Sequence, residues 1–284
     1  MLPFNKIAEV EDFADPGFRE VLRRVFPHEL ARFGPAYPLG HEYRKDWEVA
    51  MAVRALAEFG ALHREAEILG VGAGNEPTSF YLTNFVRRVF ATDLFLSEEW
   101  AESASPGMMI APERYWPSPW DRRRLVAQQM NALDLWYVDG SFDGVYSSGS
   151  LEHFGNHADI RRSVREMHRV LKPGGILSVS TEFRIEGPSP GMPGVLMFDE
   201  SEIEELIFGA ANWEATGPLS LGLSPATRAS VQQFDDLAGN VRDHVARHGE
   251  ILFHKLNWKR YPVLLLRHGP LVWGSGHIAL RKVT

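Results

Sequence analysis

The stretch Ile68-Leu69-Gly70-Val71-Gly72-Ala73-Gly74-Asn75-Glu76 starts as an apolar run and ends in closely spaced glycines. The run over residues 67–71 predicts a strand, and residues 77–86 predict the helix that follows it. Glycines between a strand and a helix let the backbone approach a ligand and direct free N–H groups at it. A tight structural turn without a ligand is the alternative interpretation.

Downstream, short apolar runs alternate with helical patterns. Strands are predicted at residues 89–92, 125–130, 142–147 and 176–181, and a helix at residues 157–171. A further helix begins after Asp46 and ends at Gly60. This alternation predicts an α/β fold, a Rossmann-like doubly wound sheet with helices on both faces, preceded by an N-terminal helical segment.

Composition narrows the class of protein. The 284 residues carry a net charge of −7, and the only dense basic run is Arg122-Arg123-Arg124, which argues against a nucleic-acid partner. The absence of cysteine excludes disulfides and thiolate zinc sites. The sequence shows neither a signal peptide nor an apolar stretch that could span a bilayer, so we expect a cytoplasmic protein without a membrane partner.

Two polar positions follow later strands. Asp93 lies about 20 residues after the glycines, where a carboxylate can accept hydrogen bonds from a ribose; a helix N-cap is the alternative. Asn131 and Ala132 follow the third strand, where a side-chain carbonyl and a backbone N–H could bind adenine; an ordinary loop is the alternative. A dinucleotide fingerprint would require glycine where the chain has Pro77, which disfavours a nicotinamide-dependent oxidoreductase.

Three further segments complete an ordered set: Gly140-Ser141-Phe142-Asp143-Gly144-Val145, Ser150-Leu151-Glu152-His153-Phe154 and Arg169-Val170-Leu171-Lys172-Pro173-Gly174-Gly175. Over roughly residues 67–181 this set resembles the class I methyltransferases, above all their small-molecule, type 11-like branch. The resemblance implies seven strands, mostly parallel with an antiparallel last strand. It also implies the cofactor S-adenosylmethionine and a small-molecule acceptor with an O, N or C nucleophile.

Carried over by position, the resemblance implies cofactor contacts for Gly70, Gly72, Gly74, Glu76, Asp93, Leu94, Asn131, Ala132 and Ser148. Three positions depart from the family pattern. Gly70 stands where an acidic residue is usual, Glu76 stands near the usual third glycine, and Asn131 replaces a common aspartate. Glu76 is a candidate for the carboxylate that binds the ammonium group of the cofactor. These departures leave open a methyltransferase fold that serves as an inactive scaffold.

His153 is the candidate catalytic residue, since it follows the fourth strand and an imidazole can deprotonate a hydroxyl. Orientation of a loop is the equally weighted alternative. His153 and His157 are spaced i,i+4, but the glutamate precedes the first histidine, so we expect no metal site.

We predict an N-terminal helical lid over residues 1–45 and a methyltransferase domain over residues 46–284, with insertions near 97–121 and 222–270. Acceptor specificity is expected from these variable segments. Trp100, Trp116, Trp120 and Trp136 could form an aromatic acceptor pocket or pack a loop. The charged and aromatic run 41–48 could cover the cofactor, or form a solvated helix start with Trp47 buried. The oligomeric state is open.

Overall fold

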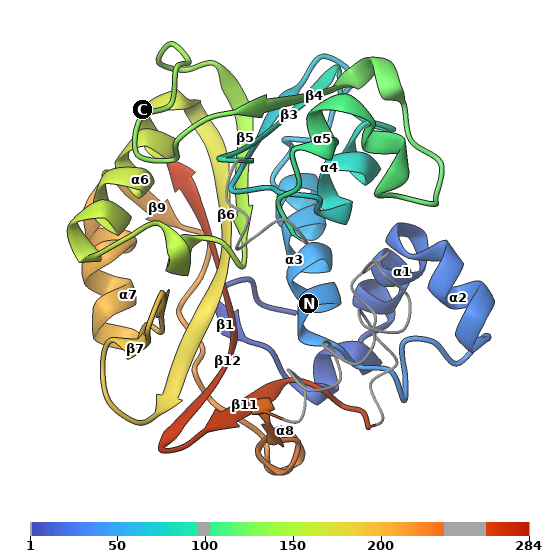
Figure 1. Ribbon diagram of the computed structural model, residues 1–284, viewed down its shortest axis with the longest axis vertical. Coiled ribbons are helices and arrows are strands. Elements are labelled where there is room, and N and C mark those ends of the chain that lie inside the picture. The colour runs from blue at the N-terminus through green and yellow to red at the C-terminus, as the bar shows by residue number, and fades with distance from the viewer. Residues whose placement is uncertain (1, 96–102, 236–259, 284) are drawn as a thin grey trace.

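One sheet organises the fold, and the computed structural model describes it through residues 2–95, 103–235 and 260–283 (Figure 1). Its centre is five parallel strands, in the spatial order β4 (Leu125–Gln129), β3 (Arg88–Asp93), β2 (Glu67–Val71), β5 (Phe142–Ser148) and β6 (Leu171–Glu186). β12 (Leu271–Lys282) runs antiparallel along β6. The predicted Rossmann-like sheet, mostly parallel with an antiparallel last strand, is confirmed.

The far edge of β12 is shared by three short strands. β11 (Leu265–His268), β1 (Lys6–Ile7) and β9 (Trp213–Ala215) each pair with a different part of β12. β10 (Gln232–Gln233) pairs with β11, so the described residues contain a ten-stranded sheet. The excess over the expected seven arises because β12 is long and one strand position beside it is divided among separate segments. A small hairpin of β7 (Gly191–Met192) and β8 (Val195–Leu196) lies outside this sheet.

Helices cover both faces of the sheet (Figure 1). One face carries α1 (Pro16–Val25), α3 (Arg44–Glu58) and α4 (Pro77–Leu82), whose buried side chains include Phe18, Leu56 and Phe80. The other face carries α6 (His157–Val170) and α7 (Glu200–Leu206), with Ile160, Val164 and Ile203 in the core. The described residues also form the helices α2 (Pro27–Phe33), α5 (Gly107–Ile110) and α8 (Pro225–Ala229). Among the helices described, none is long and apolar enough to cross a membrane.

Several predicted boundaries were wrong. Lys172-Pro173-Gly174-Gly175, which the sequence predicts to end the preceding helix, is part of β6, because Phe142 pairs with Leu171 and Gly144 with Ile176, which makes the intervening residues a bulge. The sequence also predicts a strand over residues 213–221, but this strand ends at Ala215. The sequence also predicts a helical stretch around residues 230–248; its start contains the short strand β10, residues 234 and 235 are helical, and the residues beyond 235 lie outside the described part of the chain.

The N-terminal residues are packed against α3. Asp15 caps α1, since its Oδ1 accepts a hydrogen bond from Phe18 N at 2.8 Å. Trp47 is fully buried, and its Nε1 donates to Asp12 Oδ2 at 2.8 Å. The boundary at residue 45 stays a prediction.

A buried ion pair joins α3 to the sheet. The Arg44 guanidinium donates to both carboxylate oxygens of Glu182 in β6, at 2.7 and 2.8 Å, and to Ser275 Oγ in β12 at 3.1 Å. Burial alone would raise the pKa of Glu182, but the charges of Arg44 and Lys45 lower it to about 2. The carboxylate therefore stays ionised at neutral pH, and its bidentate geometry orients α3 relative to β6 and β12.

We expect Arg44→Ala to lower the free energy of unfolding by about 3–5 kcal/mol, because the Glu182 carboxylate would lose its partner while remaining buried. Urea denaturation followed by circular dichroism measures this change. The control is Arg24→Ala, whose pair with Glu20 is exposed on both sides and should contribute about 0–1 kcal/mol. Equal losses in the two variants would contradict the role assigned to the buried pair.

Candidate functional site

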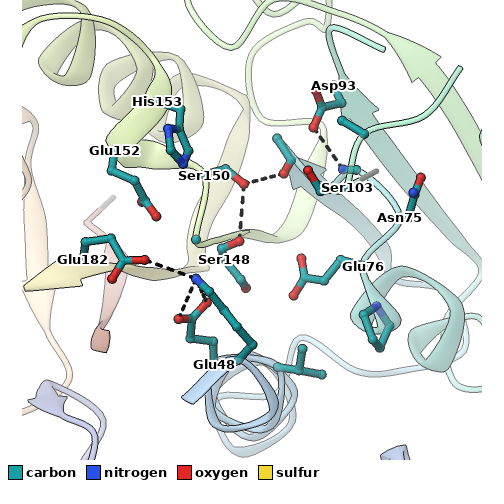
Figure 2. Close-up of a pocket in the computed structure, with 18 of the residues that line it drawn as sticks. Glu48, Asn75, Glu76, Asp93, Ser103, Ser148, Ser150, Glu152, His153 and Glu182 are labelled. Carbon is teal, nitrogen blue, oxygen red and sulfur yellow. Dashed lines mark hydrogen bonds and ion pairs between the residues drawn. The ribbon is translucent and has the colours of Figure 1, made fainter. Parts of the chain in front are cut away.

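A cavity of about 690 Å³ opens at the carboxyl ends of the parallel strands. The register explains its position: Val71 of β2 pairs with Thr92 of β3, so the glycine turn and Asp93 emerge at the same edge. The segments that follow β4 and β5 emerge there too. Figure 2 shows Asp93, Asn75 and Glu76 on one side of the cavity and Glu152 and Glu182 on the other. This edge is where parallel α/β sheets bind ligands.

The glycine turn requires its glycines. Gly72 and Gly74 have positive φ angles of 64° and 44°, and both line the cavity. A Cβ on Gly72 would lie 2.6 Å from Ser150 Cβ, and one on Gly74 would collide with the Ser103 carbonyl. Ser150 Oγ donates to Gly72 O at 2.5 Å, which joins the turn to the segment after β5.

Gly70 differs from the other candidates because it does not line the cavity. A Cβ there would lie 2.5 Å from Tyr146 Oη, so this glycine makes room for a buried tyrosine beneath the turn. The Tyr146 hydroxyl is hydrogen-bonded to Ser79 Oγ at 2.6 Å, which connects β5 to α4.

Asp93 holds the turn as well as lining the cavity. Its Oδ2 accepts a hydrogen bond from Gly74 N at 3.0 Å, and its Oδ1 accepts one from Leu94 N at 2.7 Å. Burial raises the pKa of Asp93, and these hydrogen bonds oppose that effect. Leu94 is 52% exposed and presents an apolar surface at the cavity.

Asn131 and Ala132 also line the cavity. Asn131 Oδ1 accepts a hydrogen bond from Leu133 N at 2.9 Å, so one of its two lone pairs is already engaged. Met130 N donates to Asp93 O at 2.8 Å, which fixes this loop beside the end of β3.

Glu76 presents a carboxylate oxygen to the cavity. Its Oε1 accepts a hydrogen bond from Thr78 Oγ1 at 2.6 Å, while Oε2 is buried without a hydrogen-bond partner among the described residues. Burial raises the pKa of Glu76 to about 8, although the Thr78 and Ser148 hydroxyls oppose the shift. A cation bound at Oε2 would compensate the burial of this carboxylate.

His153 lies in a 3₁₀ turn, Leu151–His153, at the rim of the cavity. Its Nδ1 is 2.9 Å from Gly194 O, and because a carbonyl only accepts, Nδ1 carries the hydrogen. In the neutral ring Nε2 is then the nitrogen that can accept a proton. His157 Nε2 lies 3.7 Å from Glu202 Oε1, so the two histidines contact different partners.

The sequence did not single out the charged groups on the opposite side of the cavity. Lys45 and Glu48 come from α3, and Lys45 Nζ lies 3.0 Å from Glu48 Oε1 and 3.4 Å from Glu182 Oε1. Glu152 comes from the turn after β5, and its Oε2 accepts a hydrogen bond from Thr181 Oγ1 at 2.8 Å. Two sequence features could have identified most of these residues, namely the charged run 41–48 and the motif Leu151-Glu152-His153.

The tryptophans were expected either to form an acceptor pocket or to pack a loop, and the structure shows examples of both. Trp116 lines the cavity, whereas Trp120 packs edge-on against Phe80 at 5.1 Å between ring centroids. Trp136 is 78% exposed, and Trp100 lies outside the described residues. In the run 41–48, Trp47 is buried while its neighbours Lys45 and Glu48 line the cavity.

Comparison with known proteins finds a family that matches part of the chain. Residues 69–179 match the family described as "Methyltransferase domain". The 27-O-demethylrifamycin SV methyltransferase of Amycolatopsis mediterranei is 24% identical over 191 residues, covering 63% of this chain and 65% of that protein. An O-methyltransferase of Aspergillus sclerotiorum is 27% identical over 176 residues, covering 62% of this chain and 59% of that protein. Each similarity therefore spans less than two thirds of the relative's length.

A solved structure from Galdieria sulphuraria, named "putative sarcosine dimethylglycine methyltransferase", has the same fold. It superposes with a TM-score of 0.52 at 17% sequence identity and covers 84% of this chain and 85% of its own. At this identity the likeness bears on the fold alone.

Proposed function

We propose that this chain, which carries a class I methyltransferase domain, transfers a methyl group from S-adenosylmethionine to a small-molecule acceptor. The observation that carries the proposal is Glu76, which lines the cavity beside the glycine turn and whose buried Oε2 has no hydrogen-bond partner among the residues described. The match over residues 69–179 and the relatives named as O-methyltransferases support it.

The residues of the cavity fit this cofactor piece by piece. Gly72 and Gly74 leave room for its methionine part, the Glu76 carboxylate binds its ammonium group, and the backbone at Ser148 lies beside that group. The Asp93 carboxylate binds the ribose hydroxyls. Leu94 packs against the adenine, with Asn131 and Ala132 at its polar edge. In this assignment Gly70 does not contact the cofactor, and its lack of a side chain leaves space for Tyr146 beneath the turn.

S-adenosylmethionine supplies a methyl group activated by its positively charged sulfur. The protein's own contribution is alignment of that group with the acceptor in a cavity from which water is excluded. Of the groups at the rim, His153 Nε2 is the candidate to accept a proton from an acceptor hydroxyl.

Isothermal titration calorimetry with S-adenosylmethionine and with S-adenosylhomocysteine tests the proposal directly. We expect both to bind, and Asp93→Ala to weaken binding by about 1–3 kcal/mol through the loss of ribose hydrogen bonds. Failure of the wild-type protein to bind either compound at millimolar concentration would end the proposal.

Binding is also expected to depend on pH through Glu76. Because burial raises the pKa of Glu76 to about 8, the free carboxyl is mostly protonated at pH 7. It must release that proton to bind the ammonium group. Affinity for S-adenosylhomocysteine should therefore rise as pH increases towards 8, by at most about tenfold per unit for one proton, and then level off. Thr78, Ser148, Glu48 and Lys45 are the groups that act on this carboxyl.

Titration at pH 7 in two buffers of different ionisation enthalpy measures the proton directly, and we expect close to one proton released. Glu76→Gln should abolish the release and weaken binding at pH 8 by about 1.5–3 kcal/mol. Glu214→Gln, an exposed position on β9, is the matched control. Equal proton release by Glu76→Gln and the wild-type protein would remove Glu76 from the ammonium site.

His153→Ala is expected to reduce turnover of a hydroxyl acceptor by about 10²- to 10⁴-fold, because the proton acceptor is lost. Mass spectrometry of the methylated product measures turnover, and calorimetry should show unchanged affinity for S-adenosylhomocysteine. Near-normal turnover in this variant would exclude His153 as the base and leave alignment as the source of catalysis.

A further inference from the structure

Glu152 is a buried carboxyl with one oxygen unused. The residue is 1% exposed, yet it lines the cavity. Its Oε2 accepts the hydrogen bond from Thr181, while Oε1 has no hydrogen-bond partner in the part of the chain that is described. Figure 2 shows this carboxyl pointing into the space between His153 and Glu182. A buried acceptor without a partner is costly, and a ligand that donates a hydrogen bond would remove that cost.

The charges around Glu152 limit which ligand can bind there. The basic groups of the lining, Arg44 and Lys45, are both paired with Glu182. Asp46 and Glu48 add further carboxylates to the same cavity. An anionic acceptor would therefore enter a space with an excess of negative groups. Each described lysine or arginine that lines this space is already in an ion pair.

Apolar side chains line the same cavity as this carboxyl. An apolar wall lines the cavity here, formed by Tyr43, Met192, Val195, Phe234 and Trp273. Trp273 and Phe234 are in contact, with ring centroids 5.5 Å apart. Trp273 lies two residues from Ser275 in β12, and Ser275 is opposite Glu182 in the register of β12 and β6. The strand β8 packs against the turn that holds Glu152. The wall and the free Oε1 therefore belong to the same half of the cavity.

We propose that Glu152 Oε1 and the apolar wall form the acceptor subsite, and that this subsite selects a neutral hydroxyl compound with an apolar body. In the bound acceptor the hydroxyl donates its hydrogen to Glu152 Oε1, and it turns to His153 Nε2 when that proton is removed, while the apolar body packs on the wall. A carboxylate is rejected by charge, and an ether of the same shape is disfavoured because it leaves Oε1 without a donor. The subsite rests on the proposed function, since it assumes that the other half holds the cofactor.

Three probes with one apolar body test this selection: 2-naphthol, 2-methoxynaphthalene and 2-naphthoate. Each is titrated calorimetrically into protein already saturated with S-adenosylhomocysteine. We expect 2-naphthol to bind about 10- to 100-fold more tightly than either of the others, the range for one hydrogen bond to a charged group. Loading with S-adenosylhomocysteine is measured first, so a failure there counts against the proposed function and against this subsite with it.

Glu152→Gln should invert the selection. The Thr181 hydroxyl needs an acceptor, so the amide oxygen faces Thr181 and the amide NH₂ faces the cavity. A donor then stands where an acceptor stood. We expect 2-naphthoate to gain at least about tenfold in affinity and 2-naphthol to lose its advantage, with S-adenosylhomocysteine affinity unchanged.

Glu214→Gln is the matched control and should keep the wild-type order of affinities. If Glu152→Gln does not fold, the order of the three probes on the wild-type protein decides alone. The proposal is overturned if 2-naphthol does not bind the loaded protein at millimolar concentration. It is also overturned if 2-naphthoate or 2-methoxynaphthalene binds as tightly as 2-naphthol, or if a folded Glu152→Gln keeps the wild-type order.

Discussion

The bidentate pair between Arg44 and Glu182 is the contact on which the geometry of the cavity depends. It joins the first turn of α3 to β6, and the Ser275 contact extends it to β12. Two charges removed from water are tolerated only when each satisfies the other, so the pair permits one relative position of helix and sheet. That position brings Lys45 and Glu48 into the cavity beside Glu182. Packing of the apolar stripe of α3 alone would leave its rotation less strictly defined.

The cavity has two halves with different structural origins. The half around Gly74 and Asp93 is built by short loops at the ends of neighbouring parallel strands, where backbone hydrogen bonds determine each position. The other half is built where β6 and β12 continue beyond that edge and meet α3 and the β7–β8 hairpin. Regular strand ends suit a constant ligand, whereas the added elements can change without disturbing the sheet.

The features that could be predicted from the sequence are those whose interacting residues lie close together along the chain. Gly74 and Asp93, which are joined by a hydrogen bond, are only 19 residues apart. The glycine turn itself is visible as a local sequence pattern. Arg44 and Glu182 are 138 residues apart, and neither carries a local pattern that names its partner. The extra strands beside β12 were not predicted for the same reason. A strand as short as β1, in which Lys6 pairs with His277, is too short to show a periodic pattern of apolar residues.

The sequence by itself determined the order of the five parallel strands, the glycine turn and the acidic end of β3, because these depend on local backbone preference and the period of apolar residues. Only the tertiary structure decided which carboxylates face one cavity, that Gly70 supports Tyr146 instead of lining the cavity, and that Glu152 is buried with a free oxygen. Burial and partnership of a charged group are properties of the surroundings that distant segments create, and those surroundings exist only after the sheet, α3 and β12 have come together.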